Sequence, residues 1–208
     1  MSHTIILNKT AASVRHLLAA DERLNRVIHT VGDITYSPEK DAFSFLAEVI
    51  IGQMLSNKVA EILAERFRKL CNGNVVPCTV RELNPHELRA IGISARKADY
   101  IYRLAALAAE DHGFFEGLSA LDDDTAIKQL TKLQGIGSWS AKMYLIFVLD
   151  RQDVLPLEDG AFLQAYAWLY DTSERSAEEI EKRCACWRPY SSIAARYMYR
   201  ALDLGLTK

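Results

Sequence analysis

Apolar residues recur along most of the chain at intervals of three and four, the spacing of one face of an α-helix. The clearest example is residues 57–70, where Val59, Ile62, Leu63 and Phe67 share a face. The same spacing predicts further helices over residues 11–30 with a break near Asp21, over a segment after Pro38 that contains Phe43 and Leu46, over residues 94–107, 122–133, 138–149 and 161–170, and over a last segment from Pro189 to about Leu204.

Two polar pairs have the spacing of a capping box, in which Ser or Thr begins a helix and Glu three residues later bonds back to it. Thr79 and Glu82 predict a helix that ends before Gly92, and Ser176 and Glu179 predict another. The helix boundaries are thus marked by the polar residues as well as by the apolar period.

Alternating apolar and polar positions, which would indicate strands, do not run long enough to predict a sheet. Ile5–Leu7 and Val75–Val76 are at most short extended pieces. We therefore predict an all-α helical bundle.

Composition adds mainly exclusions. Half of the 208 residues are hydrophobic, but no run approaches 18 apolar residues, so we expect no membrane span and no membrane partner. The N-terminus does not resemble a secretory signal, which favours a cytoplasmic protein, associated with the nucleoid if it is bacterial. The net charge of −2 does not favour nucleic-acid binding. Charge alone favours a small-molecule enzyme or a protein-interaction module.

The segment 133–141 is the most informative one. A helix ends, a turn containing Gly135 and Gly137 follows, and a new helix begins at Ser138. Glycine allows another backbone to approach closely, and the start of a helix offers N–H groups and a partial positive charge. Gln134–Ser138, with Ile136 between the glycines, can therefore bind a phosphate through backbone amides without a basic surface. An ordinary helical hairpin with a glycine cap is the alternative.

Several segments resemble motifs of a known family, and they occur along the chain in the order that the family has them. They are Leu-Gln-Gly-Ile-Gly-Ser-Trp-Ser-Ala at 133–141, the downstream Leu-Pro-Leu-Glu-Asp-Gly at 155–160, Ile-Gly-Gln-Met-Leu-Ser at 51–56, Ile-Gly-Ile-Ser-Ala-Arg-Lys-Ala at 91–98, and Trp-Arg-Pro-Tyr-Ser-Ser-Ile-Ala at 187–194. Together they resemble the helix-hairpin-helix (HhH-GPD) DNA glycosylase superfamily, which includes endonuclease III. They are most similar to its 3-methyladenine DNA glycosylase II, or alkylpurine, branch. The resemblance runs from about residue 40 to the C-terminus.

The resemblance implies one glycosylase unit over residues 1–208, built as a two-lobed helical bundle with a cleft between the lobes. It places a central lobe at about 35–125, and a hairpin and terminal-helix lobe at 1–34 plus 126–208. The implied function is a monofunctional DNA glycosylase that hydrolyses the N-glycosidic bond of a flipped damaged base in base excision repair. The expected base is an alkylated purine such as 3-methyladenine, and the expected partner is double-stranded DNA, bound by a monomer. A same-fold glycosylase for an oxidised or mismatched base, or a non-catalytic HhH DNA-binding protein, are the alternatives.

By the same resemblance, Asp159 is the catalytic acid. Breaking a glycosidic bond develops positive charge on the sugar, which a nearby carboxylate stabilises while it orients or deprotonates water. Capping of the following helix is the alternative role for Asp159, and the two roles are compatible. Glu158 is the rival acid, but Asp159 has the register of the family.

The resemblance also assigns the base pocket. Bifunctional members carry a lysine that forms a Schiff base at the position of Trp139, so the chain lacks the expected nucleophile for strand cleavage. Trp139, Met143 and Tyr199 are the expected pocket residues, with Tyr199 stacking on the base. Trp139 as plain interhelical packing is an equal alternative.

The turn at 53–56 is the implied wedge, with Gln53 or Leu55 filling the gap left by the flipped base. Core packing is the alternative for Met54 and Leu55. By the resemblance, the hairpin carbonyls of Gln134, Gly135 and Ile136 are the candidate site for a monovalent cation, and we predict no other metal.

The four cysteines, Cys71, Cys78, Cys184 and Cys186, do not have the spacing of a zinc site or of the family's iron–sulfur cluster. We therefore expect no cofactor.

Overall fold

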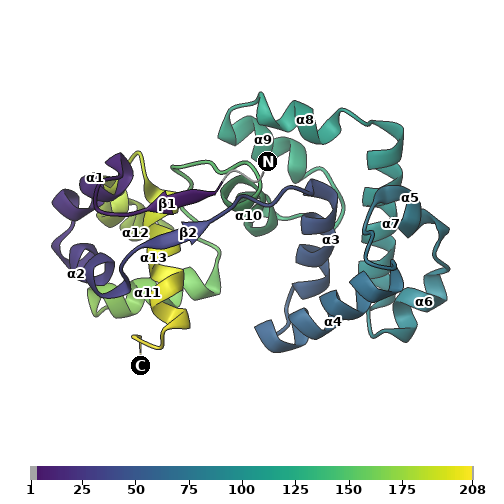
Figure 1. Cartoon of the computed structure of the whole chain (residues 1–208), viewed down its shortest axis with the longest axis horizontal. Coiled ribbons are helices and arrows are strands. Elements are labelled where there is room, and N and C mark those ends of the chain that lie inside the picture. Colours follow the sequence, from purple (N-terminus) through teal and green to yellow (C-terminus); the bar gives the residue numbers. More distant parts are fainter. Residues whose placement is uncertain (1–3, 208) are drawn as a thin grey trace. The chain divides into compact units, whose positions relative to one another are not determined.

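The computed structural model describes residues 4–207 and divides into two compact units. Unit 1 combines the residues up to Pro38 with those from Leu145 onward, and unit 2 is Glu39–Tyr144. The elements of the described chain are overwhelmingly helical, as predicted (Figure 1).

Unit 1 contains β1 (Ile5–Leu7), α1 (Ala12–Ala20), α2 (Glu22–Val31), β2 (Ile34–Tyr36), α11 (Gly160–Tyr170), α12 (Ala177–Cys184), the short 3₁₀ helix η1 (Ala185–Trp187) and α13 (Ser191–Asp203). The predicted break near Asp21 is confirmed. Asp21 separates α1 from α2, and its carboxylate accepts hydrogen bonds from the Arg23 and Leu24 amides at 2.9 and 3.0 Å. An aspartate cap of this kind satisfies N–H groups that the first helical turn leaves without partners.

A small sheet corrects the expectation of a purely helical chain. β1 and β2 lie side by side (Figure 1). They pair in antiparallel fashion, with Ile5 opposite Tyr36 and Leu7 opposite Ile34. Three-residue strands are too short to show alternation, so the pattern did not predict the pairing. Val75–Val76 is not a strand.

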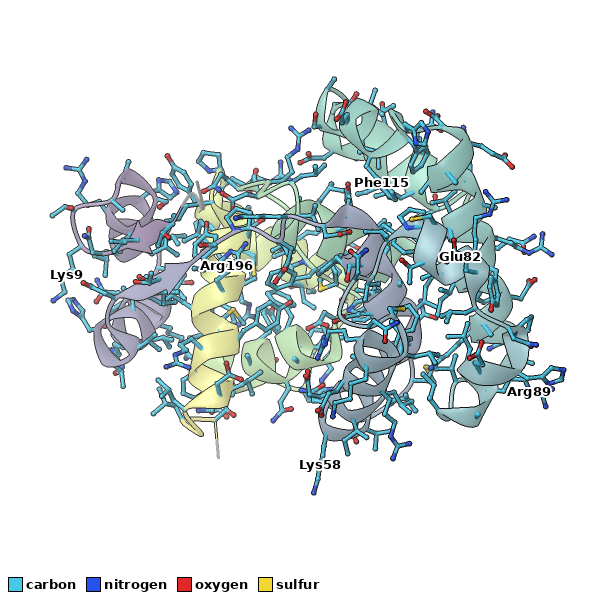
Figure 2. All side chains as sticks on the ribbon, turned by 45° about the vertical axis from the view of Figure 1, so that its right-hand side comes forward. Lys9, Lys58, Glu82, Arg89, Phe115 and Arg196 are labelled. Atoms are coloured by element: carbon cyan, nitrogen blue, oxygen red, sulfur yellow. The ribbon has the colours of Figure 1, made fainter. Side chains whose placement is uncertain are left out.

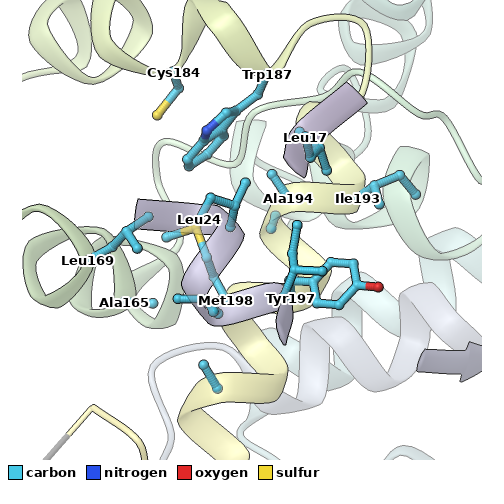
Figure 3. Close-up of a cluster of buried hydrophobic side chains, with 14 of the residues drawn as sticks. Leu17, Leu24, Ala165, Leu169, Cys184, Trp187, Ile193, Ala194, Tyr197 and Met198 are labelled. Carbon is cyan, nitrogen blue, oxygen red and sulfur yellow. The ribbon is translucent and has the colours of Figure 1, made fainter. Parts of the chain in front are cut away.

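The core of unit 1 lies where its two terminal segments meet. Leu17 and Leu24 from the N-terminal helices pack with Trp187, Tyr197 and Met198 from the C-terminal ones, all of them fully buried (Figure 3). The N-terminal and C-terminal segments of the chain therefore form one unit, and α11 and α13 belong to it.

Unit 2 contains α3 (Ala42–Gly52), α4 (Asn57–Leu70), α5 (Pro77–Glu82), α6 (Pro85–Ala90), α7 (Ala95–Glu110), α8 (Phe114–Ser119), α9 (Asp123–Leu130) and the greater part of α10 (Ser138–Phe147). The helix predicted at 57–70 is confirmed at both ends. Ser94 caps α7, since its hydroxyl accepts from the Lys97 amide at 3.4 Å. α8 was not predicted, and α9 ends three residues earlier than Leu133.

Both predicted capping boxes are wrong. Thr79 lies inside α5, and the box belongs to α6, where Asn84 caps the helix and its amide donates to Glu87 at 2.7 Å. Pro85 at the first position of α6 divides the segment, because proline starts a helix far more easily than it continues one. Ser176 does precede α12, but its side chain makes no cap hydrogen bond.

The division of the chain also differs from the expected lobes. Residues 126–144, which include the hairpin, belong to unit 2, whereas the resemblance placed them with the terminal segments. The reason is local bonding of the hairpin to α3 and α7, described below. No helix in residues 4–207 combines the length and apolar character needed to cross a membrane.

Candidate functional site

The hairpin of unit 2 joins α9 to α10 by the predicted glycine turn. Gly135 has φ +86°, and the Ile136 amide donates to the Leu133 carbonyl at 3.1 Å. Ile136 is buried, whereas Gln134 and Gly137 are exposed. The exposed side of the turn thus leads directly into the start of α10, where a helix attracts anions.

Gly135 is required for packing as well as for its backbone angle. A Cβ atom at this position would lie 2.4 Å from Cδ2 of Tyr100 in α7. No side chain fits there without displacing α7 or the turn. By contrast, a Cβ atom on Gly137 would meet no atom within 4 Å, and the φ angle of Gly137 is not positive.

Gln53, one of the two expected wedge residues, is bonded to the hairpin. Its Nε2 donates to the Gly135 carbonyl at 2.7 Å and to Oγ of Ser140 at 3.2 Å. Its own carbonyl accepts from Nζ of Lys97 at 2.8 Å, and the same amine bonds the Ile51 carbonyl at 2.7 Å. Burial, followed by the charge of Arg96, lowers the pKa of Lys97. The structure therefore uses Gln53 to join the turn after α3 to the hairpin.

Met54, which is not one of the expected wedge residues, is the most exposed apolar residue of this turn. Its exposed fraction is 101 %, against 37 % for Leu55. Its φ is +60°, a left-handed conformation that is unfavourable for a side chain of this kind. Core packing, the alternative for both residues, does not apply to Met54. Its position directly after Gln53, the polar residue that follows the last residue of α3, is the signal that could have identified it.

The expected cation site consists of backbone carbonyls of the hairpin. Of the carbonyls of Gln134, Gly135 and Ile136, that of Gly135 already accepts the Gln53 amide. Within residues 4–207, no group of three or more His, Cys, Asp or Glu side chains is arranged to hold a metal ion.

Asp159 of unit 1 caps α11. One carboxylate oxygen, Oδ1, accepts from the Phe162 amide at 2.8 Å, and the Asp159 amide donates to the Pro156 carbonyl at 3.0 Å. The side chain is half-buried, whereas the rival acid, Glu158, is exposed. The capping role is therefore confirmed, and it fixes the carboxylate at the positive end of a helix.

Tyr199 of α13 belongs to the same unit as Asp159. Its ring lies 6.3 Å from that of Phe147, with an angle of 31° between their planes. Its hydroxyl is buried and meets no acceptor in good hydrogen-bond geometry. Burial, followed by the nearby charge of Asp159, raises the pKa of Tyr199. A neutral hydroxyl and a carboxylate thus lie in one neighbourhood.

Trp139 and Met143, the other expected pocket residues, lie in the part of α10 that belongs to unit 2. Trp139 is half-buried, which fits either a pocket wall or helix packing. Met143 is 6 % exposed, so little of its surface is open to a ligand.

The cysteines are divided between the units, with Cys71 and Cys78 in unit 2 and Cys184 and Cys186 in unit 1. Burial raises the pKa of the Cys71 thiol to about 11 and also raises that of Cys184. Both buried thiols are therefore held in their unreactive, protonated form.

Comparison with known proteins agrees with these features. Residues 47–189 match the model of the HhH-GPD superfamily base excision DNA repair proteins. The chain is 29% identical to DNA-3-methyladenine glycosylase 1 of Schizosaccharomyces pombe over 211 residues, which cover 96% of this chain and 90% of that protein.

Solved structures give the same result. A crystal structure of a DNA-3-methyladenine glycosidase from Bacillus halodurans superposes with a TM-score of 0.82 at 27% identity, covering 97% of this chain and 94% of the other. The S. pombe 3-methyladenine DNA glycosylase in complex with abasic DNA gives a TM-score of 0.83 at 27% identity, covering 93% and 97%. With more than half of its length matched, the chain belongs to the HhH-GPD superfamily of base excision DNA repair proteins.

Proposed function

We propose that the protein is a monofunctional DNA glycosylase that hydrolyses the N-glycosidic bond of an alkylated purine, such as 3-methyladenine, flipped out of duplex DNA. The proteins it is similar to are named for 3-methyladenine, and one was solved with abasic DNA, the product of such a reaction. The observation that carries the proposal is the half-buried carboxylate of Asp159. The Phe162 amide holds this carboxylate in place, and Tyr199 lies near it.

The chemistry follows from that placement. As the bond to the base breaks, the sugar gains positive charge, and a fixed carboxylate stabilises it without having to reorganise. Asp159 then orients or deprotonates the water that attacks the sugar. Tyr199 offers an aromatic face for the extruded base, which is electron-poor when alkylated.

DNA is held by the hairpin in this proposal. The backbone of Gln134–Ser138 binds a phosphate of the damaged strand, which explains how a chain with a net charge of −2 grips a polyanion. Met54 replaces Gln53 and Leu55 as the proposed wedge, because it is fully exposed whereas Gln53 is bonded to the hairpin.

The monofunctional assignment rests on Trp139, which by the resemblance occupies the position of the family's Schiff-base lysine. We infer that water is the nucleophile, that a monomer acts alone, and that no iron–sulfur cluster takes part. Size-exclusion chromatography and the visible absorption spectrum of the purified protein test the last two inferences.

The decisive experiment measures release of free base from duplexes that each carry one defined lesion. We expect the wild-type protein to release 3-methyladenine and to leave the DNA strand uncut until alkali or heat is applied. We expect Asp159→Asn to release no 3-methyladenine. Asp122→Asn is the matched control, because Asp122 also caps a helix and accepts from the Thr125 amide at 2.9 Å. Equal activity of Asp159→Asn and wild type contradicts the assignment of the acid, and spontaneous nicking contradicts the monofunctional one.

A second candidate is a glycosylase of the same fold for another lesion. Two points favour keeping it. By the resemblance, Tyr199 stands at a position that is often Trp in the alkylpurine branch and Met143 at one that is often aromatic, and Met143 is buried. Duplexes carrying oxidised or mismatched bases in the same assay separate the two candidates.

A further inference from the structure

Arg196 is a buried charge that the proposed reaction has not used. It extends from α13 (Figure 2), and only 9 % of its side chain is exposed. Its guanidinium carbon lies 3.8 Å from the centroid of the Tyr36 ring and 4.9 Å from that of Phe147. Both distances are within the range of cation–π attraction.

Hydrogen bonds fix the guanidinium in that place. Nη2 donates to the Ile146 carbonyl at 2.7 Å, near the C-terminal end of α10, and lies 3.5 Å from Oδ1 of Asp150. The same Asp150 oxygen accepts the Tyr36 hydroxyl at 2.9 Å. Nε of Arg196 is buried and has no hydrogen-bond partner. Hydrogen bonds alone therefore do not explain why this guanidinium is buried.

The rings that Arg196 contacts lead to the candidate site. Phe147 lies against Tyr199, which neighbours Asp159. Arg196 also precedes Tyr199 by three residues in α13, a spacing that puts two side chains on one side of a helix. Tyr36, Arg196, Phe147 and Tyr199 thus form a continuous set within unit 1.

We propose that Arg196 is a positioning residue of the base pocket, which fixes Phe147 and, through it, the ring of Tyr199 beside Asp159. A planar guanidinium that is hydrogen-bonded and lies over two rings has little freedom, so it is a stiffer support than an aliphatic side chain. Errors of about 1 Å in such a support lower the rate of a positioned reaction strongly. This inference rests on the proposed function.

Two substitutions test it. Arg196→Met keeps an unbranched side chain that reaches about as far as Nε but removes the charge and the donors, and Arg196→Lys keeps the charge but not the planar group. We expect Arg196→Met to lower the single-turnover rate of base release on the order of tenfold, while its affinity for a duplex with an abasic-site analogue stays at the wild-type value. We expect an intermediate rate for Arg196→Lys.

Arg183→Met is the matched control, because Arg183 also lies over a tyrosine ring of unit 1, 5.0 Å from the centroid of Tyr170, but is exposed. We expect it to keep the wild-type rate. Thermal unfolding of each variant shows whether it is folded, and if Arg196→Met is not, Arg196→Lys decides.

A wild-type rate in either folded Arg196 variant overturns the inference, as does a rate loss matched by an equal loss of abasic-DNA affinity. A wild-type protein that releases no base from any lesion overturns the proposed function instead, and this inference with it.

Discussion

The Asp159 carboxylate accepts a hydrogen bond from the Phe162 amide, so the proposed catalytic acid is also the residue that caps the start of α11. Replacing it by alanine should therefore have two effects. Asp159→Ala should lose base release and also about 1 kcal/mol of the free energy of unfolding, whereas Asp159→Asn, which keeps an acceptor oxygen, should lose activity at a smaller cost in stability. Urea denaturation measures the difference.

A second capping aspartate provides the control for that prediction. Asp41 caps α3 and accepts from the Ser44 amide at 2.8 Å. Asp41→Ala should lose stability while retaining base release. If Asp159→Asn proves as unstable as Asp159→Ala, loss of the helix cap is not the reason why Asp159→Ala is destabilised.

The two hairpin glycines should respond in opposite ways. Gly135→Ala forces a Cβ into contact with Tyr100 at a left-handed φ, and should cost at least about 1 kcal/mol of stability. Gly137→Ala meets no protein atom and should leave stability unchanged, but its methyl group should weaken duplex binding by about 1 kcal/mol if the backbone touches a phosphate there. Thermal unfolding and fluorescence anisotropy with labelled duplex measure the two effects. Wild-type DNA affinity in Gly137→Ala would argue against the hairpin as the phosphate grip.

The side chain of Met54 should lower the stability of the fold and contribute to base release. Met54→Gly removes a side chain from a left-handed position and should raise the free energy of unfolding by up to about 1 kcal/mol. It should also slow base release from duplex DNA, because nothing fills the gap in the base stack. Met54→Leu should retain most of the rate. The control is Asn72→Gly, also at positive φ (53°) but after α4, which should not change base release.

Asp21 should make the stability of the protein depend on acid. Burial by itself raises the pKa of Asp21, but hydrogen bonds from the Tyr170 hydroxyl, the Trp187 indole and two backbone amides together hold that pKa below its usual value. A carboxyl with a lowered pKa in the folded state stabilises the fold above its unfolded pKa, and this contribution is lost as the pH falls through the folded pKa. Stability should therefore fall below about pH 4.

The measurement is urea denaturation across a pH series. Asp21→Asn should be less stable than wild type at neutral pH and should show a flatter decline in acid. Glu178→Gln, which removes one exposed carboxylate from the start of α12, should keep the wild-type pH dependence. A parallel decline in Asp21→Asn and wild type would show that other groups are responsible.

Most of the helices were predictable because their signals are local. The period at 57–70, the break at Asp21 and the cap at Ser94 depend on residues within one or two turns. The errors arose where a distant or competing partner decides. β1 needs β2, more than twenty residues later, and Pro85 overrides the pair of Thr79 and Glu82.

The candidate site was predictable to a similar degree. The cap at Asp159 and the turn at Gly135 follow from residue type and position. The bond from Gln53 to Gly135 joins residues that are far apart in the chain, and the outward direction of Met54 depends on a backbone angle that most residues avoid. Arg196 gave no signal, because a single arginine in an amphipathic helix is normally solvated.

The division of the chain has a consequence for its synthesis. Residues 39–144 leave the ribosome as one uninterrupted stretch, whereas residues 4–38 pack with a segment that begins only at Leu145. Unit 2 can therefore acquire its structure while translation continues, and the N-terminal helices must wait, with Leu17 and Leu24 uncovered, for Trp187 and Met198 to be made. Limited proteolysis of stalled nascent chains that contain unit 2 but not yet Trp187 and Met198 should cut the N-terminal segment and leave unit 2 uncut.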